Sequence, residues 1–169
     1  MLSTMLQMHL QYKEWQVKRL LAAVKALPTE TFEQQRGSSH GSIKGTLQHI
    51  YGADFVWLQR LKGHSLTRAD VHIPETLDEL ERRWLKLLAE WRAWASSIDE
   101  AAWHRTLDYT LFSGSPGSNP FWQVLLHVVN HGTQHGGQVM AMLRQAGVTP
   151  PAIDILMFYC ELQEPPASA

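Results

Sequence analysis

The sequence predicts an all-α fold, an antiparallel four-helix bundle with a short extra C-terminal helix. Apolar residues recur at three- and four-residue spacing along four long stretches of the chain, which is the pattern of amphipathic helices. A proline or glycine follows three of these stretches, and a capping residue precedes three of them. At 169 residues the chain is long enough to bury one core. We therefore expect a single domain over residues 1–163 and a flexible tail over residues 164–169.

The first two helices are delimited by their flanking residues. A helix over residues 4–27 ends before Pro28, and its apolar residues are Leu6, Leu10, Val17, Leu20, Leu21, Val24 and Leu27. The polar stretch 34–41 follows as a loop. Ser42 is a candidate N-cap for a second helix over residues 43–62, which ends at Gly63.

The third helix has the clearest pattern. Thr76 and Glu79 have the spacing of a capping box. Apolar residues then follow at steps of three and four, as in the seam of a helical bundle: Leu77, Leu80, Trp84, Leu87, Trp91, Trp94 and Ile98. Residues 105–118 change to an alternating pattern and then cluster glycine, serine and proline, which predicts a short extended segment or hairpin.

Two Pro-containing pairs predict the starts of the last helices. The Asn119-Pro120 pair opens the fourth long helix, with Pro120 at its first position, and this helix runs to about residue 146. The Thr149-Pro150 pair opens a short fifth helix that ends near residue 162. Both predictions rest on the preference of proline for the first turn of a helix.

Composition excludes several functional classes. The net charge is −1 and the pI is about 6.7, with Lys and Arg scattered, so no basic surface for nucleic acid is expected. No apolar run reaches the roughly 18 residues of a membrane span, and no signal-peptide pattern is present. The single cysteine, Cys160, suits a reducing compartment. We therefore expect a cytoplasmic protein without a membrane or nucleic-acid partner.

Three histidines share one stripe of the fourth helix. His127, His131 and His135 are spaced four residues apart, so neighbouring imidazoles lie one above the other. At about 100° per residue, the stripe shares a sector with apolar residues and should meet the core. A buried imidazole costs free energy unless its ring nitrogens find partners, and a metal ion is one such partner. His127 and His135 are about 12 Å apart along the helix, too far to share one ion.

A second helix must supply a further ligand, and His49 is the best candidate. It lies in the middle of the second helix, beside the apolar stripe. The other histidines fall near predicted helix ends, in loops or on polar stretches: His9, His40, His64, His72 and His104. A core-facing histidine is more often a hydrogen-bonded structural residue than a ligand. Spacing alone therefore leaves both interpretations open.

Two further features of the helices need an explanation. Asp54 falls within the apolar stripe of the second helix, where it either orients a ligand imidazole or bonds to a helix terminus or a tryptophan. Glycines inside the fourth helix cost stability, so a neighbouring helix or a ligand should approach closely at Gly132, Gly136 and Gly137. No phosphate-binding loop, dinucleotide fingerprint or paired-cysteine motif occurs.

Four segments resemble the DinB/YfiT-like family. They are Gly41-Ser42-Ile43-(x)3-Leu47-x-His49-Ile50, Ala53-Asp54-(x)2-Trp57-Leu58, His127-Val128-Val129-Asn130-His131-Gly132-Thr133-Gln134-His135 and Pro150-Pro151-Ala152-Ile153-Asp154. The resemblance spans about residues 41–158, and the His-Val-x-Asn-His-Gly-x-x-His string is its most specific part. It implies an up-down-down-up bundle, often dimeric, that holds a divalent metal.

The resemblance also implies which residues act. The metal ligands carried over are His49, His131 and His135, with His127 matching an additional histidine that is not a ligand. Many relatives have Arg directly after the last histidine, where this chain has Gly136, so any substrate contact made by that Arg is not expected here. The name of the family does not imply DNA binding.

Three functional interpretations follow. Three imidazoles leave an open position on an ion such as zinc or nickel, which is typical of catalytic sites. Characterised relatives include enzymes that use low-molecular-weight thiols, so we expect a metal-dependent thiol S-transferase acting on an electrophilic small molecule. A hydrolase using metal-bound water and a non-catalytic metal-binding bundle are the alternatives. His127 is a candidate proton relay. The fourth helix is apolar on nearly every face, which favours a homodimer.

Overall fold

Four long helices make up most of the molecule. The computed structural model describes residues 1–163, so the predicted tail 164–169 lies outside the described residues. The long helices are α1 (Leu2–Lys25), α3 (Ile43–Leu61), α4 (Leu77–Ser96) and α5 (Phe121–Gln145). Their bounds lie within about two residues of the predicted ones, which confirms a mostly helical fold.

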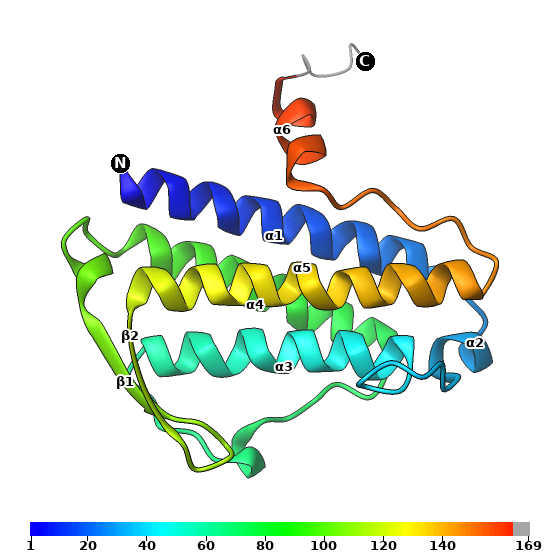
Figure 1. The fold of residues 1–169 in the computed structure, drawn as a ribbon, viewed down its shortest axis with the longest axis horizontal. Coiled ribbons are helices and arrows are strands. Elements are labelled where there is room, and N and C mark those ends of the chain that lie inside the picture. The colour runs from blue at the N-terminus through cyan, green and yellow to red at the C-terminus, as the bar shows by residue number, and fades with distance from the viewer. Residues whose placement is uncertain (164–169) are drawn as a thin grey trace.

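The long helices lie side by side, and two of them run against the other two (Figure 1). In Figure 1, α1 and α5 run from left to right, and α3 and α4 run from right to left. Helix α5 packs against α1 and α3, and α4 packs against the same two helices from the other side. This arrangement sets the histidines of α5 beside His49, the single histidine of α3. Within residues 1–163, no helix is both long enough and apolar enough to cross a membrane.

A hairpin connects α4 to α5, so the fold is not purely helical. It consists of β1 (Thr106–Thr110) and β2 (Pro116–Pro120), which pair antiparallel with Tyr109 opposite Gly117. The alternating pattern of residues 105–118 predicted this excursion correctly. The predicted start of the fourth helix was wrong by one position, because Pro120 ends β2 and precedes the helix as its N-cap.

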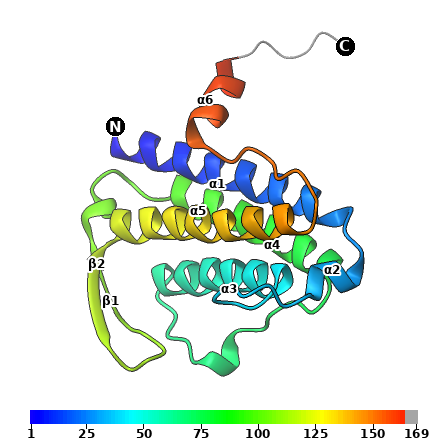
Figure 2. The same cartoon turned by 45° about the vertical axis from the view of Figure 1, so that its right-hand side comes forward.

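The shorter helices complete the connections. They are α2 (Thr29–Glu33), two 3-10 turns at Arg68–Asp70 and Ala102–His104, and α6 (Ile155–Gln163), which stands off the body in Figure 2. The prediction that a helix opens at Thr149-Pro150 was wrong, because residues 148–154 have no regular structure. A second proline, Pro151, disfavours the helical conformation of Pro150. The Tyr12 hydroxyl donates a hydrogen bond to the carbonyl of Ile153 (2.8 Å), which ties this segment to α1.

Candidate metal centre

Four histidines converge where α3 packs against α5. His49 comes from the middle of α3, and His131 and His135 come from successive turns of α5. The fourth, His40, comes from the loop between α2 and α3. His135 is only 8% exposed and the other three are half-buried. Packing of two helices that each carry inward histidines therefore creates a cluster of imidazoles at one place.

The three histidines predicted as ligands lie within contact distance of one another. The Nε2 atoms of His49 and His131 are 3.0 Å apart. The ring centroid of His135 lies 4.6 Å from that of His49 and 4.4 Å from that of His131. Two nitrogens bound to one ion at about 2.0–2.1 Å would be about 2.9 Å apart at a right angle and about 3.3 Å apart in a tetrahedron. The His49–His131 spacing therefore fits two ligands on one ion, as well as an N–H···N hydrogen bond between the two rings.

His40 is the residue that the sequence interpretation missed. Its ring stacks on that of His49, with centroids 3.6 Å apart and planes inclined by 17°. It also meets the edge of His135, at 5.1 Å between centroids. His40, His49 and His135 each offer a ring nitrogen within 4.8 Å of the others. The signal in the sequence was local: His40 lies two residues before Ser42, whose side chain caps α3.

Burial favours the uncharged form of three of these imidazoles, those of His40, His49 and His131. It is the main cause that lowers the pKa of His49 to about 4, with smaller contributions from neighbouring His40 and His135. Burial likewise lowers the pKa of His131 to about 3, with contributions from His135 and His49. The pKa of His40 is lowered first by burial and then by His135. Neutral imidazole is the form that binds a metal ion, so protons compete little for these three side chains near pH 7.

Two hydrogen-bonding details bear on whether an ion fits. Nδ1 of His135 donates to Oε1 of Gln138 (2.9 Å), which leaves its Nε2 lone pair free. Nδ1 of His131 is buried and has no hydrogen-bond partner within the described residues. Nε2 of His131 faces the like atom of His49. Such a set of nitrogens suits zinc, nickel or copper, which prefer imidazole ligands. The residues present therefore fit a divalent metal.

His127 does not join the cluster. It is exposed, and its ring meets the edge of Trp57 at 5.4 Å and lies 5.7 Å from the ring of His131. The expectation that the whole stripe faces the core was wrong at this end. Residues four apart advance by about 40° around a helix, so His127 is turned by about 80° from His135. The stripe therefore passes from buried at His135 to exposed at His127.

Asp54 contacts other partners than a histidine. Its Oδ1 lies 2.9 Å from Nζ of Lys13, and its Oδ2 accepts a hydrogen bond from Nε1 of Trp84 (2.8 Å). Five residues separate Asp54 from His49, which turns it by about 140° around α3, toward α1 and α4. Among residues 1–163 no histidine bonds to it, and the tryptophan alternative left open by the sequence is the one observed. Gln138, not Asp54, orients a histidine of the cluster.

Two of the three α5 glycines mark close approaches. A Cβ on Gly132 would meet Nζ of Lys13 at 2.6 Å, so this glycine admits the buried lysine. A Cβ on Gly136 would lie 3.1 Å from Ile153, so an arginine would not fit there without displacing its neighbours. Gly137 has open space instead, which corrects the prediction for that position.

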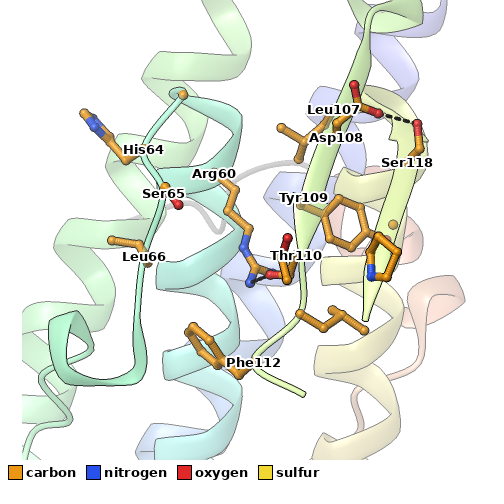
Figure 3. Close-up of a pocket in the computed structure, with 14 residues that line it drawn as sticks. Arg60, His64, Ser65, Leu66, Leu107, Asp108, Tyr109, Thr110, Phe112 and Ser118 are labelled. Carbon is orange, nitrogen blue, oxygen red and sulfur yellow. Dashed lines mark hydrogen bonds between the residues drawn. The ribbon is translucent and has the colours of Figure 1, made fainter. Parts of the chain in front are cut away.

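A cavity of about 830 Å³ lies elsewhere, between the end of α3 and the hairpin (Figure 3). The guanidinium of Arg60 points into it, lies 4.8 Å from the Trp57 ring and donates to the carbonyl of Thr110 (2.6 Å). Arg60 follows His49 by 11 residues, about 16 Å along the helix. The cavity is therefore separate from the histidines, and Trp57 stands between Tyr109 of the hairpin and His127.

Comparison with known proteins identifies the family. The family model described as "DinB family" matches residues 1–165. The chain is 28% identical over 152 residues to a protein of Bacillus subtilis strain 168 named "Protein DinB", covering 85% of this chain and 87% of that protein. A crystal structure of a DinB-like protein from Bacillus cereus has a similar fold, with a TM-score of 0.65 and 21% identity over 85% of this chain and 94% of that one. The chain belongs to the DinB family.

Proposed function

We propose that this DinB-family chain binds a divalent metal ion, zinc or nickel, through His49, His131 and His135. The observation that carries the proposal is the 3.0 Å approach of the His49 and His131 ring nitrogens. Two neutral imidazoles at this distance share at most one proton between them, whereas an ion would engage both lone pairs. Four long helices, two of which run against the other two, support the up-down-down-up bundle that the family resemblance implies, and in this proposal α3 and α5 supply the three ligands.

The metal content of the full chain tests this proposal. Protein purified without an affinity tag should carry about one divalent ion per chain by elemental analysis. His131→Ala should lose the ion, and His64→Ala, which changes an exposed loop histidine outside the cluster, should keep it. An unchanged metal content in His131→Ala would show that the ligand assignment is wrong.

The activity that fits such a site best is transfer of a low-molecular-weight thiol to an electrophilic small molecule. A bound divalent ion supplies Lewis acidity, which lowers the pKa of a coordinated thiol. The protein's own part is to hold the ligands, through the rigid helices and the hydrogen bond from His135 to Gln138. In this proposal His127 passes on a proton, and its exposed position beside Trp57, with its ring 5.7 Å from that of His131, supports the role.

Turnover assays separate this activity from its alternatives. The metal-loaded protein should consume a chromogenic electrophile only when a thiol is present, and several thiols should be compared. Consumption at an equal rate without thiol would favour the hydrolase, in which water replaces the thiol. Metal binding without any turnover would favour the non-catalytic metal-binding protein.

The proposal includes a homodimer. The sequence suggested α5 as the interface, but α5 packs between α1 and α3, which accounts for much of its apolar surface. Large apolar residues are exposed on α6 instead: Leu156, Met157 and Leu162 are 68%, 45% and 52% exposed. Light scattering at micromolar concentration should give twice the chain mass of 19.3 kDa. A single 19.3 kDa species would refute the dimer.

A further inference from the structure

We propose that His40 is a fourth imidazole ligand of the metal ion. This inference rests on the proposed metal-binding function and adds to it a ligand outside the set implied by the family resemblance. His40 is the only member of the cluster that comes from a loop rather than a helix, among the residues the structure describes.

The position of His40 is close to that of a ligand. One ring nitrogen of His40 lies within 4.8 Å of those of both His49 and His135. Two nitrogens on one tetrahedral ion, each about 2.05 Å from it, are about 3.3 Å apart. A displacement of about 1.5 Å would therefore bring the most distant pair onto a common ion. The ring of His40 is stacked on that of His49, with planes inclined by 17°, so the His40 ring must also tilt until the lone pair of its nitrogen points at the ion.

The loop is built to hold His40 over α3. Gly41 has φ +77°, a conformation that glycine adopts without strain, and its N–H donates to the carbonyl of Ser38 (3.0 Å). Its carbonyl accepts from the N–H of Arg36 (2.8 Å), which closes the loop on itself. A Cβ on Gly45 would lie 2.2 Å from the carbonyl oxygen of His40, so glycine there lets the loop rest on the first turn of α3.

The origin of each ligand assigns different roles to the four imidazoles. His49, His131 and His135 are fixed by helices that pack along their length, whereas His40 is held by a short loop. An incoming donor atom of a substrate can replace His40 on the ion while the other three histidines retain it. His40 would thus cover the open position in the resting protein, and substrate would uncover it.

The test counts ligands directly on the full-length protein loaded with Co²⁺. In a proton NMR spectrum, each imidazole bound to Co²⁺ gives one strongly shifted, exchangeable ring N–H signal. Wild type should show four such signals and His40→Phe, which keeps a ring stacked on His49, should show three. Competition against a zinc chelator should show at least about 10-fold weaker Zn²⁺ binding for His40→Phe, since even residues beyond the ligands have effects of this size. His40→Asn provides a second variant, and His64→Ala is the matched loop-histidine control.

The outcomes separate the two proposals. Three shifted signals in both wild type and His40→Phe, with equal Zn²⁺ affinity, would overturn the role of His40 and leave the metal-binding function intact. Absence of bound Co²⁺ and Zn²⁺ in wild type would overturn the metal-binding function and this inference together. Four signals in wild type and a selective loss in the His40 variants would support the inference, whether or not turnover is detected.

Discussion

A buried ion pair and a cluster of histidines lie in the same helical body, and they differ in the partners that their polar atoms find. Lys13 and Asp54 are both 0% exposed, and they face each other as an ion pair across α1 and α3. Lys13 also donates to the carbonyl of Val128 (3.2 Å), and Asp54 accepts from Trp84. The histidine cluster lies nearby, and the ring nitrogens of its members face one another.

The difference between the two shows which of them finds all its polar partners within the chain. The ion pair brings its own opposite charges, and burial, which raises the pKa of Asp54, is opposed by Lys13 and Trp84. The histidines bring several lone pairs and no opposite charge, so only a cation from outside can engage them together. We infer that the ion pair serves the fold and that the cluster serves a ligand.

The largest effect should come from breaking the ion pair. Lys13→Met leaves the Asp54 carboxylate buried without its cation, which should lower the free energy of unfolding by about 3–5 kcal/mol. Urea unfolding of the metal-free protein measures this. The double variant Lys13→Met/Asp54→Asn should lose less than the sum of the single variants, because it leaves no unpaired charge. A loss below about 1 kcal/mol in Lys13→Met would contradict the comparison.

Metal binding should stabilise the folded protein through the histidine cluster, and this stabilisation should not depend on the ion pair. Zn²⁺ at 100 times its Kd should raise the free energy of unfolding by about 2.7 kcal/mol, provided that the unfolded chain does not bind it. Thermal unfolding with Zn²⁺ and with a chelator measures the gain. The gain should vanish in His131→Ala and persist in Lys13→Met after allowance for its lower stability. An equal gain in His131→Ala would mean that zinc is held without His131, as by the group His40, His49 and His135.

The metal-free protein should become less stable as the pH falls below neutrality. The pKa values of His49 and His131 are lowered to about 4 and about 3, while those of the unfolded chain are about 6.5. Between pH 6.5 and 4 the unfolded state therefore binds more protons, and stability decreases as the pH decreases. Urea midpoints at pH 7, 6 and 5 in the presence of a chelator measure the slope. His49→Gln should flatten it, and a slope unchanged by that substitution would assign it to other groups.

The smallest effect is expected at His127, which marks the edge of the cluster. Because it is exposed and binds no ion in the proposal, His127→Gln should keep the metal and change stability by no more than about 0.5 kcal/mol. Turnover, if present, should decrease. His135→Gln is the comparison and should lose the metal. Equal metal depletion by the two substitutions would require a new ligand set centred on His127 and His131.

Local patterns in the sequence were sufficient for the helices and for part of the site. Ser42 and Thr76 cap α3 and α4 as expected, with side-chain oxygens that accept from Gly45 and Glu79. The four-residue spacing of His131 and His135 placed their rings in contact. These features depend on hydrogen bonds and side chains within one or two turns, so a single stretch of sequence contains the information.

The helical period predicts which side chains share one face of a helix, but it does not predict what that face contacts. It gives the angle of a side chain around its own helix axis but not the neighbour that lies at that angle. His127 and His135 belong to one stripe in the sequence, yet one is exposed and the other buried, because the two side chains are turned by about 80° from each other around α5. The same limit applies to Asp54, whose partner Lys13 is 41 positions away on α1.

By itself, the sequence determined the long helices, the extended excursion between α4 and α5, and the histidine pair on α5. Only the tertiary structure decided that His40 lies on His49 and that Asp54 bonds to Lys13 and Trp84. The physical reason is range: helix formation and capping depend on residues within about four positions of each other. Contacts between a loop and a helix, or between two helices, depend on how the whole core packs, which no local spacing encodes.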